Sequence, residues 1–196
     1  MLSQSEVQTV LEPYHHLLRK VVEDAWQIWE SVPATIRAML SPTAQATMIH
    51  DFVEHEVRNQ LGHLPGVVLG ECQRLFFAEV ERKVVIRFKK LDSLGRASNV
   101  QTEQVKKYNA QGFLPGVPDV IKLNLGYTLD QTNTSITSIM ISMPNGRHIA
   151  WHYSIPDTVQ TVATVTPLTP RRPREGGRRV WPKVPTRKPE DENDNA

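Results

Sequence analysis

The sequence predicts an α+β protein in which an N-terminal helical layer packs on a five-stranded, mostly antiparallel sheet, followed by a disordered basic C-terminal tail. Apolar residues recur at helical spacing before residue 62, alternate with polar residues over the next hundred, and become sparse after that. The 196 residues therefore divide into a helical layer at 1–62, a sheet region at 63–164 within the same domain, and a Pro/Arg-rich tail at 165–196.

The first predicted helix covers about residues 5–30. Ser3 and Glu6 have the spacing of a capping box, and an apolar stripe follows them at helical spacing. Pro13 lies inside this stripe and removes a backbone donor. The helix therefore either bends at Pro13 or begins near Glu12.

A serine followed closely by a proline marks two further helix starts, because serine caps a helix and proline fits its first turn. This pattern predicts a short helix at 33–40 and a longer one at 42–61. Gly62 then ends the longer helix.

Alternating patterns predict five strands, at 75–80, 84–91, 119–129, 135–143 and 147–155. A tight turn at 81–83 joins the first two, and a short helix is expected around 101–110. Asn145 and Gly146 are the preferred pair for a two-residue type I′ hairpin between the last two strands.

Arg87 and Lys89 lie two residues apart in the second predicted strand, so they share one face of the sheet. Such a pair can hold a phosphate or a carboxylate cluster, with arginine as a planar fork and lysine as a point charge. The alternative is a solvent-facing edge strand, where lysines block pairing with another chain.

The long helix carries a second polar cluster that begins at His50 and Asp51. Asp51 and His55 are four residues apart, as are His50 and Glu54, so each pair can meet on the helix surface as an acid and base couple. The cluster lacks the H-E-x-x-H spacing of a zinc site, so no metal site is predicted. The alternative is a solvated helix face.

Several kinds of chemistry are not supported by the sequence. The strand at 84–91 offers Arg87 and Lys89 where a magnesium nuclease needs a glutamate and a lysine. The glycines have no phosphate-loop spacing, and no cofactor is predicted. Cys72 is interpreted as a small buried hydrophobic residue. A metal-independent ribonuclease stays open, with a histidine as general base and cations that stabilise the phosphate.

Basic charge is concentrated in the tail. Residues 1–164 hold 15 basic and 16 acidic side chains, whereas 165–196 hold 8 basic and 5 acidic ones. Arginines and lysines around one tryptophan can contact nucleic-acid phosphates while the ring stacks on a base. The predicted nucleic-acid-binding residues are Arg171, Arg172, Arg174, Arg178, Arg179, Trp181 and Lys183. The alternatives are a solubilising tail and a segment that docks an acidic protein partner.

Neither a run of 18 apolar residues nor a secretory signal is present in the sequence. We therefore expect no membrane partner and a cytoplasmic location.

Three stretches carry a resemblance to known proteins: Ile86–Asp92 (IRFKKLD), the positions Asn99, Thr102 and Gln104, and Leu125–Asp130 (LGYTLD). Over about residues 45–155 the chain resembles a loosely defined group of small bacterial proteins that are sometimes encoded beside helix-turn-helix regulators. The resemblance implies a bacterial or phage origin and a place in a two-gene module of the toxin-antitoxin kind. It implies no catalytic residues.

These observations together predict a bacterial protein that interacts with nucleic acid, RNA rather than DNA, as a toxin-like ribonuclease of a two-gene module. The predicted catalytic residues are His50, Asp51, Arg87 and Lys89, facing one pocket. The alternative is a non-catalytic protein-interaction module that docks a transcriptional regulator.

Overall fold

The computed structural model describes residues 3–98 and 102–157. These residues belong to the first of two units into which the chain divides, residues 1–159 and 160–196. The predicted disordered tail at 165–196 lies outside the described residues, as do its seven predicted nucleic-acid-binding residues.

The described helices are α1 (Gln4–Leu11), the 3₁₀ turn η1 (Glu12–Tyr14), α2 (His15–Ser31), α3 (Ala34–Met39), α4 (Pro42–Leu61) and α5 (Glu103–Asn109). The single helix expected at 5–30 is thus divided by a 3₁₀ turn that contains Pro13. Proline cannot donate the helical hydrogen bond, so the chain tightens there and continues in α2. Ser3 forms the capping box with Glu6, and Ser41 caps α4 by accepting from the amide of Ala44.

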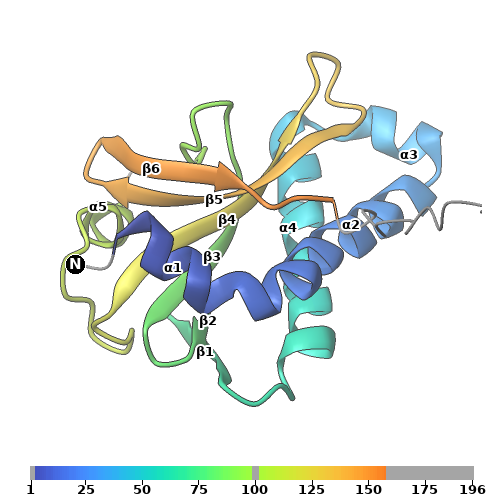
Figure 1. The fold of residues 1–196 in the computed structure, drawn as a ribbon. Coiled ribbons are helices and arrows are strands. Elements are labelled where there is room, and N and C mark those ends of the chain that lie inside the picture. The colour runs from blue at the N-terminus through green and yellow to red at the C-terminus, as the bar shows by residue number, and fades with distance from the viewer. Residues whose placement is uncertain (1–2, 99–101, 158–196) are drawn as a thin grey trace, which may run out of the picture. The chain divides into compact units, whose positions relative to one another are not determined.

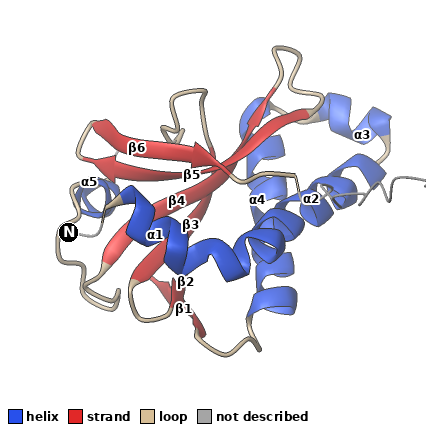
Figure 2. Cartoon of the chain, viewed as in Figure 1, coloured by secondary structure: helices blue, strands red, loops and turns tan. Residues whose placement is uncertain are grey.

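The sheet has six strands, where the sequence predicted five. They are β1 (Val67–Cys72), β2 (Leu75–Val80), β3 (Val84–Lys90), β4 (Ile121–Leu129), β5 (Ile136–Asn145) and β6 (His148–Ser154), in that spatial order. All neighbours are antiparallel except β3 and β4, which are parallel and are connected through α5. The sheet is therefore mixed, and Figure 2 shows its strands beside the helices.

β1 was missed because its turn into β2 carries no glycine or asparagine. Gln73 and Arg74 form that two-residue turn with φ values of 50° and 65°. Left-handed conformations at both positions are typical of a type I′ hairpin, for which Asn-Gly is the usual sequence signal.

The hairpin between β5 and β6 exists, but its turn lies one residue later than predicted. Asn145 pairs with His148, which leaves Gly146 and Arg147 as the two turn residues. Only Gly146 has a positive φ, of 65°, as expected for a type II′ turn, whose first central residue is glycine. The predicted type I′ turn at Asn145 and Gly146 is therefore wrong.

Helices lie on both faces of the sheet (Figure 1). Each face has its own hydrophobic cluster. The larger cluster joins α1, α2 and α4 to alternate residues of the central strands, among them Ile86, Phe88 and Leu125. The smaller cluster lies on the opposite face, where Tyr108 of α5 packs beside Val85. Trp26 and Trp29 of α2 are buried in the larger cluster.

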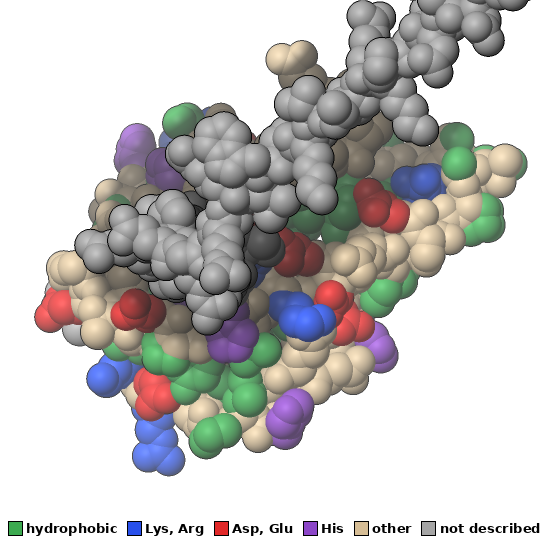
Figure 3. Space-filling view, turned by 45° about the vertical axis from the view of Figure 1, so that its right-hand side comes forward, with side chains coloured by type: hydrophobic (Ala, Val, Ile, Leu, Met, Phe, Trp, Pro, Cys, Tyr) green, Lys and Arg blue, Asp and Glu red, His purple; other side chains and the backbone are tan. Residues whose placement is uncertain are grey.

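None of the helices within the described residues combines the length and the apolar character that a membrane span requires. On the face drawn in Figure 3, charged side chains of both signs are interspersed among hydrophobic and polar ones. The described side chains that are visible in this view form no large patch of a single charge.

Candidate functional site

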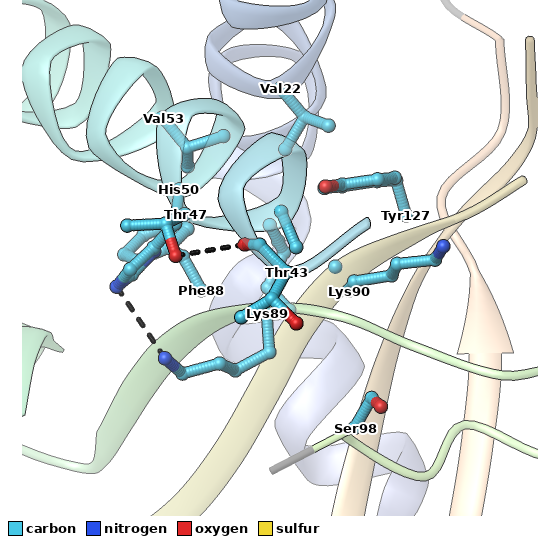
Figure 4. Close-up of a pocket in the computed structure, with 13 residues that line it drawn as sticks. Val22, Thr43, Thr47, His50, Val53, Phe88, Lys89, Lys90, Ser98 and Tyr127 are labelled. Atoms are coloured by element: carbon cyan, nitrogen blue, oxygen red, sulfur yellow. Dashed lines mark hydrogen bonds between the residues drawn. The ribbon is translucent and has the colours of Figure 1, made fainter. Parts of the chain in front are cut away.

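A cavity of about 210 Å³ lies between α4 and the carboxyl-terminal parts of the parallel strands β3 and β4. Its polar lining includes Thr43, Thr47 and His50 from α4, and Lys89 and Lys90 from β3. Figure 4 shows the side chain of Lys89 extending from the strand toward His50. The cavity therefore brings together two of the four residues that the sequence predicted as catalytic. We call it the His50 pocket.

Lys89 reaches the helix because the edge of β3 is open at this point. β2 pairs with β3 only at Val84–Ile86, so no neighbouring strand covers Lys89 on that side. On its other side Lys89 is in register with Gly126 of β4, where an added Cβ would lie 1.7 Å from the carbonyl oxygen of Lys89. Glycine at 126 therefore lets the two strands pair closely beneath the pocket.

The Nζ atom of Lys89 lies 3.4 Å from Nε2 of His50. An ammonium group can only donate, so Nε2 accepts and the imidazole proton is carried on Nδ1. The Nε2 atom of His50 is thus in the basic form, directly beside a cation.

Burial and like charge shift the pKa values of both groups in the same direction. Burial lowers the pKa of His50, and the nearby charge of Lys89 lowers it further. Burial also lowers the pKa of Lys89, to about 8, with Arg87 as the next cause. At neutral pH the pocket therefore holds a neutral imidazole and a protonated amine. This is the pairing that a general base and an electrostatic stabiliser require.

Arg87 does not line the His50 pocket, although its charge acts on both His50 and Lys89. Its side chain is buried, with 5% exposure, and its guanidinium lies over the ring of Tyr108 at 4.6 Å from the ring centre. Its Nη1 atom is buried without a hydrogen-bond partner among the described residues. Arg87 therefore adds positive potential from the face of the sheet that α5 covers, and does not contact a ligand in this pocket.

Asp51 also lies outside the pocket, because its side chain is exposed on the next position of α4. The expected helix-surface couples take other partners. His55 hydrogen-bonds with Asn59 at 2.9 Å, and Glu54 accepts from Arg58 at 2.6 Å. The polar cluster predicted at 50–55 is thus mostly a solvated helix face, from which only His50 turns into the cavity.

Sequence reasoning missed other polar residues of this pocket, among them Thr43, Thr47 and Lys90. Thr43, Thr47 and His50 follow one another at spacings of four and three residues, so they share one face of α4. This spacing was visible in the sequence. Lys90 extends the opposite way from Lys89, and its Nζ donates to Oδ1 of Asn133 at 2.8 Å.

Within residues 3–98 and 102–157, no three His, Cys, Asp or Glu side chains come together in a way that could hold a metal ion. Cys72, which the sequence placed in the core, is only partly buried. Its Sγ donates to the carbonyl oxygen of Pro115 at 3.1 Å.

Comparison of the chain with protein-family models, with curated proteins and with solved structures finds no match. The resemblance over residues 45–155 stays a prediction, and function is inferred from the geometry of the His50 pocket.

Proposed function

We propose that the chain binds RNA and cleaves it without a metal ion, with the His50 pocket holding the phosphodiester at the cleaved bond. The observation that carries this proposal is the 3.4 Å contact between Lys89 and His50 in a partly buried cavity. A neutral imidazole beside a cation can accept a proton while the cation stabilises a phosphate that gains negative charge.

The reaction follows from these two groups. The substrate hydroxyl takes the place of Lys89 as the partner of Nε2, and Lys89 turns to the phosphate. The 2′-oxygen bonds to phosphorus, its proton passes to Nε2 of His50, and the bond from phosphorus to the 5′-oxygen breaks. The 5′-oxygen takes a proton from water, which leaves a 2′,3′-cyclic phosphate. DNA has no 2′-hydroxyl, so RNA is the expected substrate.

The basic tail has a supporting role in this proposal. Its cations attract RNA without reading sequence, and Trp181 offers one ring for base stacking.

Labelled RNA and DNA of the same sequence, incubated with the full chain in excess EDTA, test the proposal. RNA should be cut to products with cyclic phosphate ends while DNA stays intact. His50→Gln should lower the rate about 10² to 10⁴-fold. The control is His55→Gln, an exposed histidine of the same helix, which should cleave at the wild-type rate. Intact RNA with the wild-type chain, or equal rates for wild type and His50→Gln, would refute cleavage at this site.

A non-catalytic module that docks a regulator is the second candidate, and α3 is the feature that favours it. This helix buries none of its residues, and Met39 is 84% exposed. Co-expression with the neighbouring gene separates the two candidates. Growth arrest that the neighbour relieves, and that His50→Gln abolishes, supports the toxin-like ribonuclease. Binding to the neighbour's product that Met39→Ser abolishes, without growth arrest, supports the module.

A further inference from the structure

A second cavity, of about 860 Å³, lies between α5, the segment at 92–98 and the turn between β5 and β6. Asn124 of β4 lines it from the sheet. Ser98 lines both this cavity and the His50 pocket, so the two hollows adjoin. We call this second hollow the Asn124 cavity.

Three hydrogen bonds hold the walls of the Asn124 cavity in place. The amide of Gly146 donates to the carbonyl oxygen of Asn109 at 2.8 Å, which ties the β5–β6 turn to the end of α5. The side-chain amide of Gln111 donates to the carbonyl oxygen of Pro144 at 2.9 Å on the same hairpin. Oγ of Ser142 in β5 donates to the carbonyl oxygen of Gly95 at 2.7 Å, which ties the segment at 92–98 to the sheet. The cavity is therefore a built feature of the fold.

Two asparagines that line the Asn124 cavity each carry a buried acceptor atom that the described residues leave unpaired. Asn124 is 1% exposed, yet its Oδ1 has no hydrogen-bond partner among the described residues. The Oδ1 atom of Asn109 is also buried without a partner among them. Buried polar atoms are almost always paired, and an unpaired one weakens the fold. Two such atoms on one cavity indicate a ligand that supplies N–H donors.

The rim of the cavity is positively charged. Arg96, Lys106 and Arg147 line it, against a single carboxylate, Asp92. Asp92 is paired with Arg96 at 2.7 Å, whereas no described carboxylate lies within ion-pair distance of Arg147. His148 adjoins Arg147 on the same rim. The rim therefore suits an anionic group, and Arg147 has a free guanidinium fork for it.

We infer that the Asn124 cavity is a nucleotide-binding site, in which the amides of Asn124 and Asn109 pair with the base and the rim cations hold the phosphate. Asparagine amides pair with an exocyclic amine and its neighbouring ring nitrogen, the edge that adenine presents. An amine-bearing base is therefore favoured over uracil. This inference goes beyond RNA cleavage, because it requires neither His50 nor Lys89.

Calorimetric titration of the full chain with AMP, UMP, adenosine and inorganic phosphate tests the site. AMP should bind at least tenfold more tightly than UMP or phosphate. Asn124→Leu, which has nearly the same shape, should weaken AMP at least tenfold while raising the thermal midpoint of the free protein. An asparagine with a purely structural role would lower that midpoint when replaced. Arg147→Gln should weaken AMP and leave adenosine unchanged.

His50→Gln is the matched control and should bind AMP like the wild type, so failure of RNA cleavage and failure of this site are separable. If Asn124→Leu does not fold, Asn109→Ala removes the second amide, and unchanged AMP binding in that variant overturns the inference. Phosphate binding as tight as AMP reduces the cavity to a general anion surface and likewise overturns it. If none of the four probes binds, the inference is also overturned.

Discussion

The amine of Lys89 and the imidazole of His50 lie within hydrogen-bond distance, at 3.4 Å, although the two residues belong to a strand and a helix and are 39 positions apart in the sequence. Burial and the charge of Lys89 lower the pKa of His50, whereas burial and the charge of Arg87 lower the pKa of Lys89. These two shifts give the pocket measurable titration behaviour.

The first prediction concerns the pKa of Lys89. Lysine carbon NMR across pH 6 to 12 should show this side chain titrating near its expected value of about 8, while an ordinary lysine titrates near about 10.4. Arg87→Met should raise the pKa of Lys89, because the charge of Arg87 is the second cause of its lowering. A Lys89 that titrates like an ordinary lysine would mean that the pocket is open to water.

The second prediction is the pH dependence of RNA cleavage. His50 must be neutral to accept a proton, and its lowered pKa places the acid limb of the rate profile below about pH 6.5. Lys89 must be protonated to stabilise the phosphate, so the rate should fall again as pH rises through about 8. Initial rates at saturating RNA between pH 4.5 and 9.5 measure the profile. In Lys89→Met the alkaline limb should vanish along with most of the activity.

The third prediction is that Arg87 weakens the fold. A buried guanidinium with an unpaired Nη1 loses hydration that its contact with Tyr108 only partly replaces. Arg87→Met should therefore raise the free energy of unfolding by about 1 kcal/mol in urea titration. Tyr108→Phe is the contrasting variant. It loses a hydroxyl that donates to the carbonyl oxygens of Leu123 and Val85, and should cost about 1 kcal/mol. A destabilised Arg87→Met would show that the guanidinium has a compensating partner in the folded chain.

The fourth prediction concerns the turn between β1 and β2. Arg74 has a φ of 65°, which glycine adopts without the strain that a Cβ brings. Arg74→Gly should therefore raise the free energy of unfolding by roughly 0.5 to 1 kcal/mol after the entropy cost of glycine is subtracted. Lys83→Gly, at a turn position outside the positive-φ set, should lower it instead. Equal effects of the two substitutions would argue against the left-handed turn.

The fifth prediction concerns the tail and RNA binding. Replacing Arg171, Arg172, Arg174, Arg178 and Arg179 by glutamine removes five positive charges from the full chain. Affinity for single-stranded RNA should fall, and the slope of log affinity against log salt should become shallower by about 0.7 for each lost phosphate contact. Fluorescence anisotropy at several salt concentrations measures both quantities. An unchanged slope would remove the tail from the RNA-binding surface.

Periodicity was enough to predict the α+β class and five of the six strands, because it records which side chains are buried. The prediction missed β1 because of its turn. Gln73 and Arg74 adopt left-handed conformations there, although glycine and asparagine are the residues that normally indicate such a turn. The parallel pairing of β3 with β4 was not predictable from local pattern either. It depends on the connection through α5 crossing over the sheet, which spans residues 91–120.

The candidate site was predictable only in part. Strand alternation placed Arg87 and Lys89 on the same face, but their surroundings differ. The ring of Tyr108 covers Arg87, whereas the pairing of β2 with β3 stops at Ile86, so Lys89 can pass beside β3 and reach α4. Both features depend on tertiary packing, so neither the extent of strand pairing nor the position of the Tyr108 ring can be predicted from the local sequence pattern around Arg87 and Lys89. The burial of Asn124 depends on α5 and the β5–β6 turn packing over it, which no local pattern in the sequence indicates.

In the parallel pair of β3 and β4, side chains and backbone groups have different roles. Two strands lie on each side of this pair, and β3 and β4 are the only adjacent strands of the described sheet that run in the same direction. Their carboxyl ends therefore emerge together at one end of the sheet. Side chains at that end, such as Lys89 and Lys90, contribute to the pocket while backbone groups alone maintain the ladder. Ligand preference can therefore be redesigned at this seam by exchanging side chains, with the strand pairing left as it is.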